Sequence, residues 1–139
     1  MLKRKAIITV TSRQIKDDSD IIEVVTPGYF YKKGSVYYAV YKETKISGME
    51  DTTTTLKISG QKLLLIRTGN TTAKMEFSGC KENISMYNTP YGTIELKIDT
   101  IKIKTDINEN GGDVTIDYNM SLSGQSPQYT KLMINVKVQ

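Results

Sequence analysis

Apolar and polar residues alternate with a period of two along most of the chain, and this pattern limits the fold more than any other feature. In one example, Ala73, Met75 and Phe77 alternate with polar residues. Successive side chains of a β-strand point to opposite faces, so the alternation predicts strands that bury one face. No segment keeps the spacing of an amphipathic helix for three turns. The chain is therefore predicted to form a single all-β domain over residues 1–139.

Glycine-bearing turns divide this pattern into about eight to ten strands. Strands are predicted over residues 5–13, 21–26, 35–44, 52–58, 62–68, 73–78, 94–107, 113–123 and 129–138. Pro27-Gly28 is predicted to interrupt the second strand, which then continues extended from 29 to 32. Sequential antiparallel strands with short turns hide their edges best by closing on themselves, which predicts a single antiparallel β-barrel.

The segment 94–107 changes its apolar phase partway along. Leu96 and Ile98 are even-numbered, whereas Ile101, Ile103 and Ile107 are odd-numbered. Because a shift of one residue moves every following side chain to the opposite face, a β-bulge is predicted near Asp99-Thr100.

Asn110-Gly111 is the strongest hairpin signal in the sequence. If these two residues form the turn, Ile103 lies opposite Tyr118 on the neighbouring strand, and Lys104 lies opposite Asp117.

The stretch from Met86 to Gly92 is interpreted as a fixed corner between two halves of one sheet. Pro90 fixes its own φ, and Gly92 can adopt backbone conformations that bulkier residues avoid. Tyr87 and Tyr91 are predicted to mark one open end of the barrel. They either form a binding rim or pack on the corner as structural residues.

The lengths of two turns decide where Arg67 points. Two loop residues at Gly60 and three at Gly69 place Arg67 opposite Thr54, at the end of an apolar interior stripe. We predict this inward orientation; a difference of one residue in either loop would instead place Arg67 in water. A buried guanidinium needs a partner, either an anionic ligand group or an internal glutamate or backbone carbonyls. If Arg67 points inward, Arg67→Leu is expected to preserve the fold and to abolish binding of any acidic ligand.

The charge of the chain permits an anionic partner without requiring one. The net charge is +4, the pI is about 9.0, and only Arg4, Arg13 and Arg67 are arginines. Arginine is favoured for phosphate and base contacts, so its scarcity disfavours nucleic acid as a partner. The alternative function left open is an RNA- or ribonucleoprotein-binding module that uses surface lysines and tyrosines. The tyrosines proposed to stack on RNA bases are Tyr29, Tyr31, Tyr87 and Tyr91.

Several kinds of catalytic chemistry lack their usual residues. Histidine is absent and Cys80 is the single cysteine, so no nucleophile triad, metal site or cofactor is predicted. Cys80 is interpreted as a turn residue in a reducing compartment. Glu43, Glu76 and Glu95 lie on different strands and are expected on the solvated face. The protein is therefore not expected to be an enzyme.

The N-terminal segment does not predict targeting to a membrane. The apolar run after Lys3-Arg4-Lys5 ends by Val10, which is too short for a signal peptide or a membrane span. The expected location is the cytoplasm, without membrane contact.

Several blocks of sequence resemble the YwiB-like family of bacterial proteins. They are, in chain order, Thr9 to Gln14, Gly48 to Leu56, Ile66 to Gly69, and Tyr87 to Gly92. The resemblance covers nearly the whole chain and implies a calycin-type barrel similar to that of lipocalins. It implies no activity. Lipocalins carry a Gly-x-Trp motif and this chain has no tryptophan, so only their shape is carried over.

The leading functional hypothesis is a non-enzymatic barrel that binds a small, partly apolar ligand inside its cavity. The ligand is anionic if its polar group is the partner of Arg67. A structural role with a protein partner is a third alternative. Five residues are the candidate ligand-binding residues: Arg67, Thr54, Tyr87, Tyr91 and Arg13.

Overall fold

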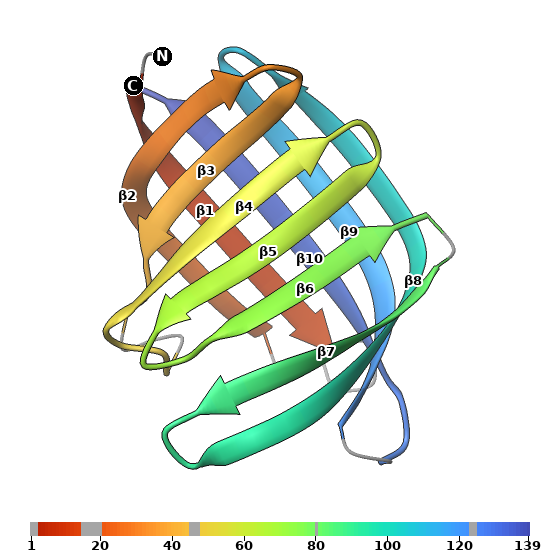
Figure 1. The fold of residues 1–139 in the computed structure, drawn as a ribbon. Coiled ribbons are helices and arrows are strands. Elements are labelled where there is room, and N and C mark those ends of the chain that lie inside the picture. Colours follow the sequence, from red (N-terminus) through yellow and green to blue (C-terminus); the bar gives the residue numbers. More distant parts are fainter. Residues whose placement is uncertain (1–2, 15–20, 45–47, 80, 123–124) are drawn as a thin grey trace.

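The computed structural model describes residues 3–14, 21–44, 48–79, 81–122 and 125–139, which form an antiparallel β-barrel (Figure 1). Its strands are β1 (Arg4–Gln14), β2 (Ile21–Lys33), β3 (Val36–Lys42), β4 (Thr52–Ser59), β5 (Lys62–Gly69), β6 (Ala73–Ser78), β7 (Glu82–Thr89), β8 (Gly92–Asn108), β9 (Gly111–Leu122) and β10 (Gln128–Val138). The all-β prediction and the upper end of the predicted strand number are confirmed. The turn predicted at Cys80 lies outside the described residues. Among the described residues, no helix is long and apolar enough to cross a bilayer.

The strands follow the order β6-β5-β4-β3-β2-β1-β10-β9-β8-β7 in one antiparallel sheet. The two end strands meet and nearly close the barrel (Figure 1). Thr72 and Asn88 exchange two backbone hydrogen bonds of 2.9 and 2.8 Å. Ser85 Oγ donates to the carbonyl of Lys74, and Asn83 Nδ2 donates to that of Glu76 at 3.3 Å. Closure therefore gives hydrogen-bond partners to some of the backbone groups that the edge strands of an open sheet would expose.

The inward face of each strand carries the apolar residues of the alternation. The fully buried side chains include Phe30, Leu56, Phe77 and Ile116. Phe77 packs edge-on against Tyr118 with 4.9 Å between ring centroids, a favoured aromatic geometry. The buried apolar side chains therefore form one continuous core inside the barrel.

Pro27-Gly28 does not interrupt β2, contrary to the prediction. Pro27 lies opposite Ile7 within the regular β1–β2 pairing. A Cβ on Gly28 would lie 2.4 Å from the carbonyl oxygen of Val40 and 2.6 Å from Ile8 Cδ1. The glycine therefore allows β3 and the core to approach the backbone closely, and the strand continues through it.

The interpretation of residues 86–92 as a corner between two halves of the sheet is wrong. The stretch contains the end of β7 and the tight turn of the β7–β8 hairpin, in which Thr89 pairs with Gly92. No strand was predicted over 82–89. The alternation there points outward, since Ile84 and Met86 are exposed whereas Ser85 is buried. The inward face of β7 thus lacks the apolar pattern that marks the other strands.

The β8–β9 hairpin forms where it was predicted, but its register was wrong by two residues. Asn108 pairs with Gly111, so the turn consists of Glu109 and Asn110. The Asn108 side chain accepts a hydrogen bond of 2.8 Å from the Asn110 amide, which stabilises this turn. Ile103 consequently lies opposite Ile116. A shift of two residues preserves the faces, so the predicted interior side remained correct.

The bulge in β8 is confirmed. The register shifts between Thr100 and Lys102, next to the predicted position. Ile98 is buried before the shift, and Ile103 packs on the core after it. Ile101, at the bulge itself, is 44% exposed, so it does not join the interior stripe expected for it.

Candidate functional site

A cavity of about 400 Å³ lies inside the barrel. Most of its lining is apolar and comes from strands on all sides, including Val24, Leu65, Phe77, Leu96, Leu132 and Ile134. Ile22 and Ile94 also line it and are 52% and 37% exposed, which indicates that the cavity opens to solvent beside them.

Arg67 lines this cavity, as the sequence predicted. Thr54 pairs with Arg67 across the β4–β5 hairpin, and Arg67 pairs with Ala73 across β5–β6. Both predicted loop lengths are therefore confirmed. The side chain is only 15% exposed, so the guanidinium is largely withdrawn from water.

The internal partner of Arg67 is Glu43, one of the alternatives that the sequence left open. Its carboxylate oxygen Oε2 lies 3.8 Å from Arg67 Nε, and the Glu43 side chain is 3% exposed. Thr54 donates its hydroxyl hydrogen bond to the same oxygen. The expectation of a solvated Glu43 was wrong. Glu43 continues the inward face of Ala39 and Tyr41 beyond the end of β3.

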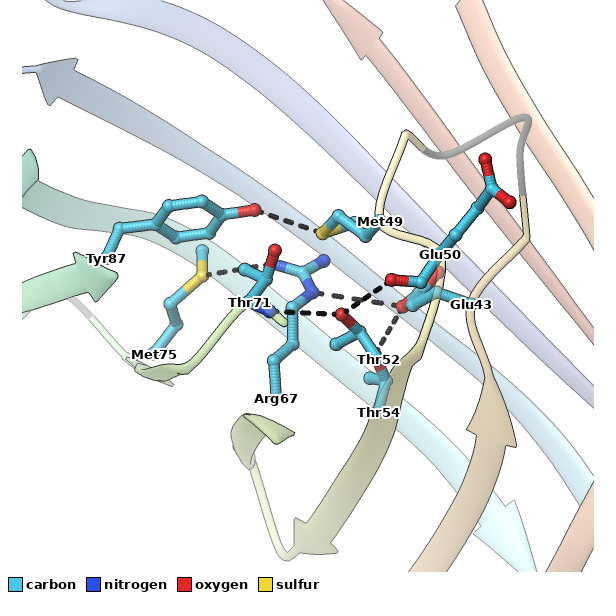
Figure 2. A network of polar contacts seen from close by, with 9 residues as sticks. All are labelled: Glu43, Met49, Glu50, Thr52, Thr54, Arg67, Thr71, Met75 and Tyr87. Atoms are coloured by element: carbon cyan, nitrogen blue, oxygen red, sulfur yellow. Dashed lines mark hydrogen bonds and ion pairs between the residues drawn. The ribbon is translucent and has the colours of Figure 1, made fainter. Parts of the chain in front are cut away.

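The guanidinium keeps hydrogen-bonding capacity that the described residues leave largely unused (Figure 2). Nη1 donates to Met75 Sδ at 3.7 Å, and a thioether is a weak acceptor. Nε is buried and has no hydrogen-bond partner among the described residues, because the contact with Glu43 is beyond hydrogen-bond length. The Arg67 guanidinium carbon also lies 6.0 Å from the centre of the Tyr87 ring.

Two buried phenols border the same charged pair. Burial, followed by the negative charge of Glu43, raises the pKa of Tyr41, while the positive charge of Arg67 opposes the rise. Burial also raises the pKa of Tyr118, against a smaller lowering by Arg67. Both phenols therefore stay protonated at neutral pH and can donate hydrogen bonds.

The described residues between β3 and β4 contribute to this end of the cavity. Met49 lines the cavity and accepts a 3.0 Å hydrogen bond from the Tyr87 hydroxyl through its sulfur (Figure 2). Thr52 Oγ1 accepts a 3.2 Å hydrogen bond from the Thr71 amide. The side chains of Thr52 and Thr54 point inward and their hydroxyl groups make internal hydrogen bonds, so these two hydroxyls stabilise the structure.

The structure brings together three of the five predicted site residues, Arg67, Thr54 and Tyr87. Tyr91 is fully exposed at the tip of the β7–β8 turn and does not line the cavity. Arg13 lies on β1 next to Ser12, which does line the cavity. Alternation within the strand turns Arg13 to the other face.

Sequence reasoning missed Glu43, Tyr41 and Met49 as members of the site. The parity of the strand would have found the first two, since Tyr37, Ala39, Tyr41 and Glu43 share one face. Met49 carries no such signal, because it lies in a loop. No group of three or more His, Cys, Asp or Glu side chains in the described part of the chain could hold a metal ion.

These observations define a class of protein. The described residues form a ten-stranded, nearly closed antiparallel β-barrel, and its internal cavity ends at a buried Arg–Glu pair. The chain belongs to the DUF1934 family, described as a domain of unknown function, whose model matches residues 7–134.

Two comparisons extend this assignment. The chain is 26% identical to the "Uncharacterized beta-barrel protein YwiB" of Bacillus subtilis (strain 168) over 137 residues, covering 96% of this chain and 94% of that protein. The crystal structure of the YwiB protein from Bacillus subtilis matches with a TM-score of 0.86 and 25% identity, covering 99% of this chain and 93% of that one. The resemblance to the YwiB-like family is thereby confirmed, whereas the likeness to calycins stays a prediction.

Proposed function

We propose that the protein binds a small, partly apolar ligand inside the barrel, with Arg67 as the polar anchor. The observation that supports this most is an apolar cavity that contains a guanidinium with unused donors. A volume of about 400 Å³ lies within the usual range of about 300–1,000 Å³ for small-molecule pockets. Nη1 of Arg67 has only a thioether as its acceptor, and a ligand oxygen placed there would supply a stronger hydrogen bond.

The first test is a search for a bound molecule. Native mass spectrometry of the purified protein is expected to show an added mass that disappears on denaturation. Protein stripped of that mass is expected to bind Nile red, a neutral apolar dye, with an increase in dye fluorescence. Absence of both signals would contradict the proposal.

A matched pair of variants locates the binding. Leu132 lines the cavity, whereas Met133 is 39% exposed on the outer face of β10. Leu132→Phe is expected to fill the cavity and weaken Nile red binding at least several-fold, while thermal stability changes by less than about 2 kcal/mol. Met133→Phe should bind the dye as the natural chain does. Equal dye binding by both variants would place the dye outside the barrel.

A second candidate function, binding of single-stranded RNA, is favoured by one row of side chains on the outer surface. Tyr31 and Tyr38 stack with 4.9 Å between ring centroids, and Lys3 and Lys57 place Nζ 5.3 and 5.5 Å from those rings. Rings and cations together suit bases and phosphates. Tyr87 lies inside the barrel and does not join this row.

Salt-dependent retention tests this second candidate. Lys57→Glu is expected to elute from a poly(U) column at lower salt than the natural chain, because phosphate contacts weaken with salt. Lys104→Glu changes the net charge equally on the outer face of β8 and serves as the control. An equal change in both variants would indicate unspecific attraction and contradict a defined RNA site.

A further inference from the structure

We propose that the cavity selects ligands whose polar end is an uncharged hydrogen-bond acceptor, such as an amide or ester carbonyl, over carboxylates. This inference rests on the proposed ligand-binding function and specifies the chemistry of its polar anchor.

The first step of the argument is the charge of the site. Arg67 is not a free cation, because Glu43 lies 3.8 Å from it and is almost fully buried. The pair has no net charge. A ligand carboxylate placed on the guanidinium would put two negative groups beside one positive group in an apolar enclosure, where solvent screening is weak.

The second step is the hydrogen-bonding capacity that remains. Glu43 Oε2 already accepts from Thr54, so this oxygen is in use. Arg67 offers the opposite: its Nη1 has only the sulfur of Met75, a weak acceptor, whereas its Nε also lacks an acceptor among the described residues but is enclosed by protein atoms. The group that lacks a good partner is therefore a hydrogen-bond donor of Arg67, and a ligand carbonyl oxygen supplies the matching acceptor without adding charge.

The third step concerns the neighbouring phenols. Tyr41 and Tyr118 both line the cavity and are buried. As neutral hydroxyl groups they add no charge to this end of the cavity, and their hydrogen bonds are made to side chains of the barrel: Tyr41 to Thr54 and Glu43, and Tyr118 to Thr130. Among the described residues that line the cavity, Arg67 and Glu43 are the charged ones.

The test compares three probes that share one apolar chain. Decanamide, decanoate and decylammonium differ only at the polar end, and their affinities are measured by isothermal titration calorimetry or by displacement of Nile red. The natural chain is expected to bind decanamide with a dissociation constant about tenfold or more lower than that of decanoate.

The variant Glu43→Gln is expected to reverse this preference. The amide of glutamine is nearly isosteric with the carboxylate but leaves the Arg67 charge uncompensated, so decanoate should then bind tighter than decanamide. Glu76→Gln is the matched control, because Glu76 is 33% exposed and pairs with Lys62 on the outer surface. This control should keep the preference of the natural chain.

The outcomes separate the inference from the function on which it rests. Binding of decanoate as tight as or tighter than decanamide by the natural chain would overturn the inference and leave the proposed function standing. Failure of all three probes and of Nile red would contradict the proposed function itself. Circular dichroism establishes whether Glu43→Gln is folded; if it is not, the comparison on the natural chain decides the inference alone.

Discussion

Replacing Arg67 with leucine is expected to lower the free energy of unfolding by about 3–5 kcal/mol, the usual cost of removing one partner from a buried ion pair. The reason is that Glu43 stays behind with a side chain only 3% exposed and no neighbouring cation. The sequence alone led us to expect that Arg67→Leu would preserve the fold if Arg67 points inward. The internal carboxylate changes that expectation. Urea denaturation measures the effect.

A double-mutant cycle shows whether the stranded charge is the cause. Glu43→Gln combined with Arg67→Leu removes both charges and should recover a large part of the loss. The coupling energy between the two sites is expected to exceed about 1 kcal/mol, within the range for residues in direct contact. Strictly additive effects would show that the pair does not interact and that Arg67 acts through packing alone.

Replacing Gly111 with alanine is expected to destabilise the barrel by about 2–6 kcal/mol. A Cβ at this position would lie 2.1 Å from the carbonyl oxygen of Val136, and the residue has φ +101°. The clash contributes roughly 1–3 kcal/mol, as in overpacked cores, and the backbone strain contributes roughly another 1–3 kcal/mol. Thermal unfolding followed by circular dichroism measures the change.

Gly34→Ala is the control that separates the two contributions. Gly34 also has positive φ, +63°, but nothing lies within 4 Å of a Cβ built there. This variant should lose only about 1–2 kcal/mol, the strain of a left-handed residue. Equal losses for Gly34→Ala and Gly111→Ala would contradict the close approach of β10 as the main cause.

The placement of Arg67 shows how far sequence reasoning reached into the site. Local turns set the register of β4, β5 and β6, and turn length limits the pairings of adjacent strands. Alternation then fixed which side chains face inward. Thr54 and Arg67 were thereby placed opposite one another. Their neighbour Glu43 was misplaced although it shares the parity of Ala39 and Tyr41, because a carboxylate was expected on the solvated face and its place on the inward face was not weighed.

The β8–β9 hairpin shows the limit of a local signal. Asn110-Gly111 favours a two-residue turn, yet Gly111 begins β9, where β10 approaches its backbone too closely for any side chain. The turn therefore forms one residue earlier, at Glu109 and Asn110. The close packing of β10 against Gly111 thus outweighs the preference of the Asn-Gly dipeptide for the two central positions of the turn.

The sequence by itself determined the class of fold and the inward face of most strands, because period-two alternation and turn residues act over short distances. It also led to the prediction that Arg67 points inward, which the structure confirms. Only the tertiary structure decided which groups surround it. Glu43 and Met49 lie between β3 and β4 whereas Tyr87 lies on β7, and the fold brings them to one end of the cavity. Contacts between residues far apart in sequence depend on the whole strand order, and no local pattern records that order.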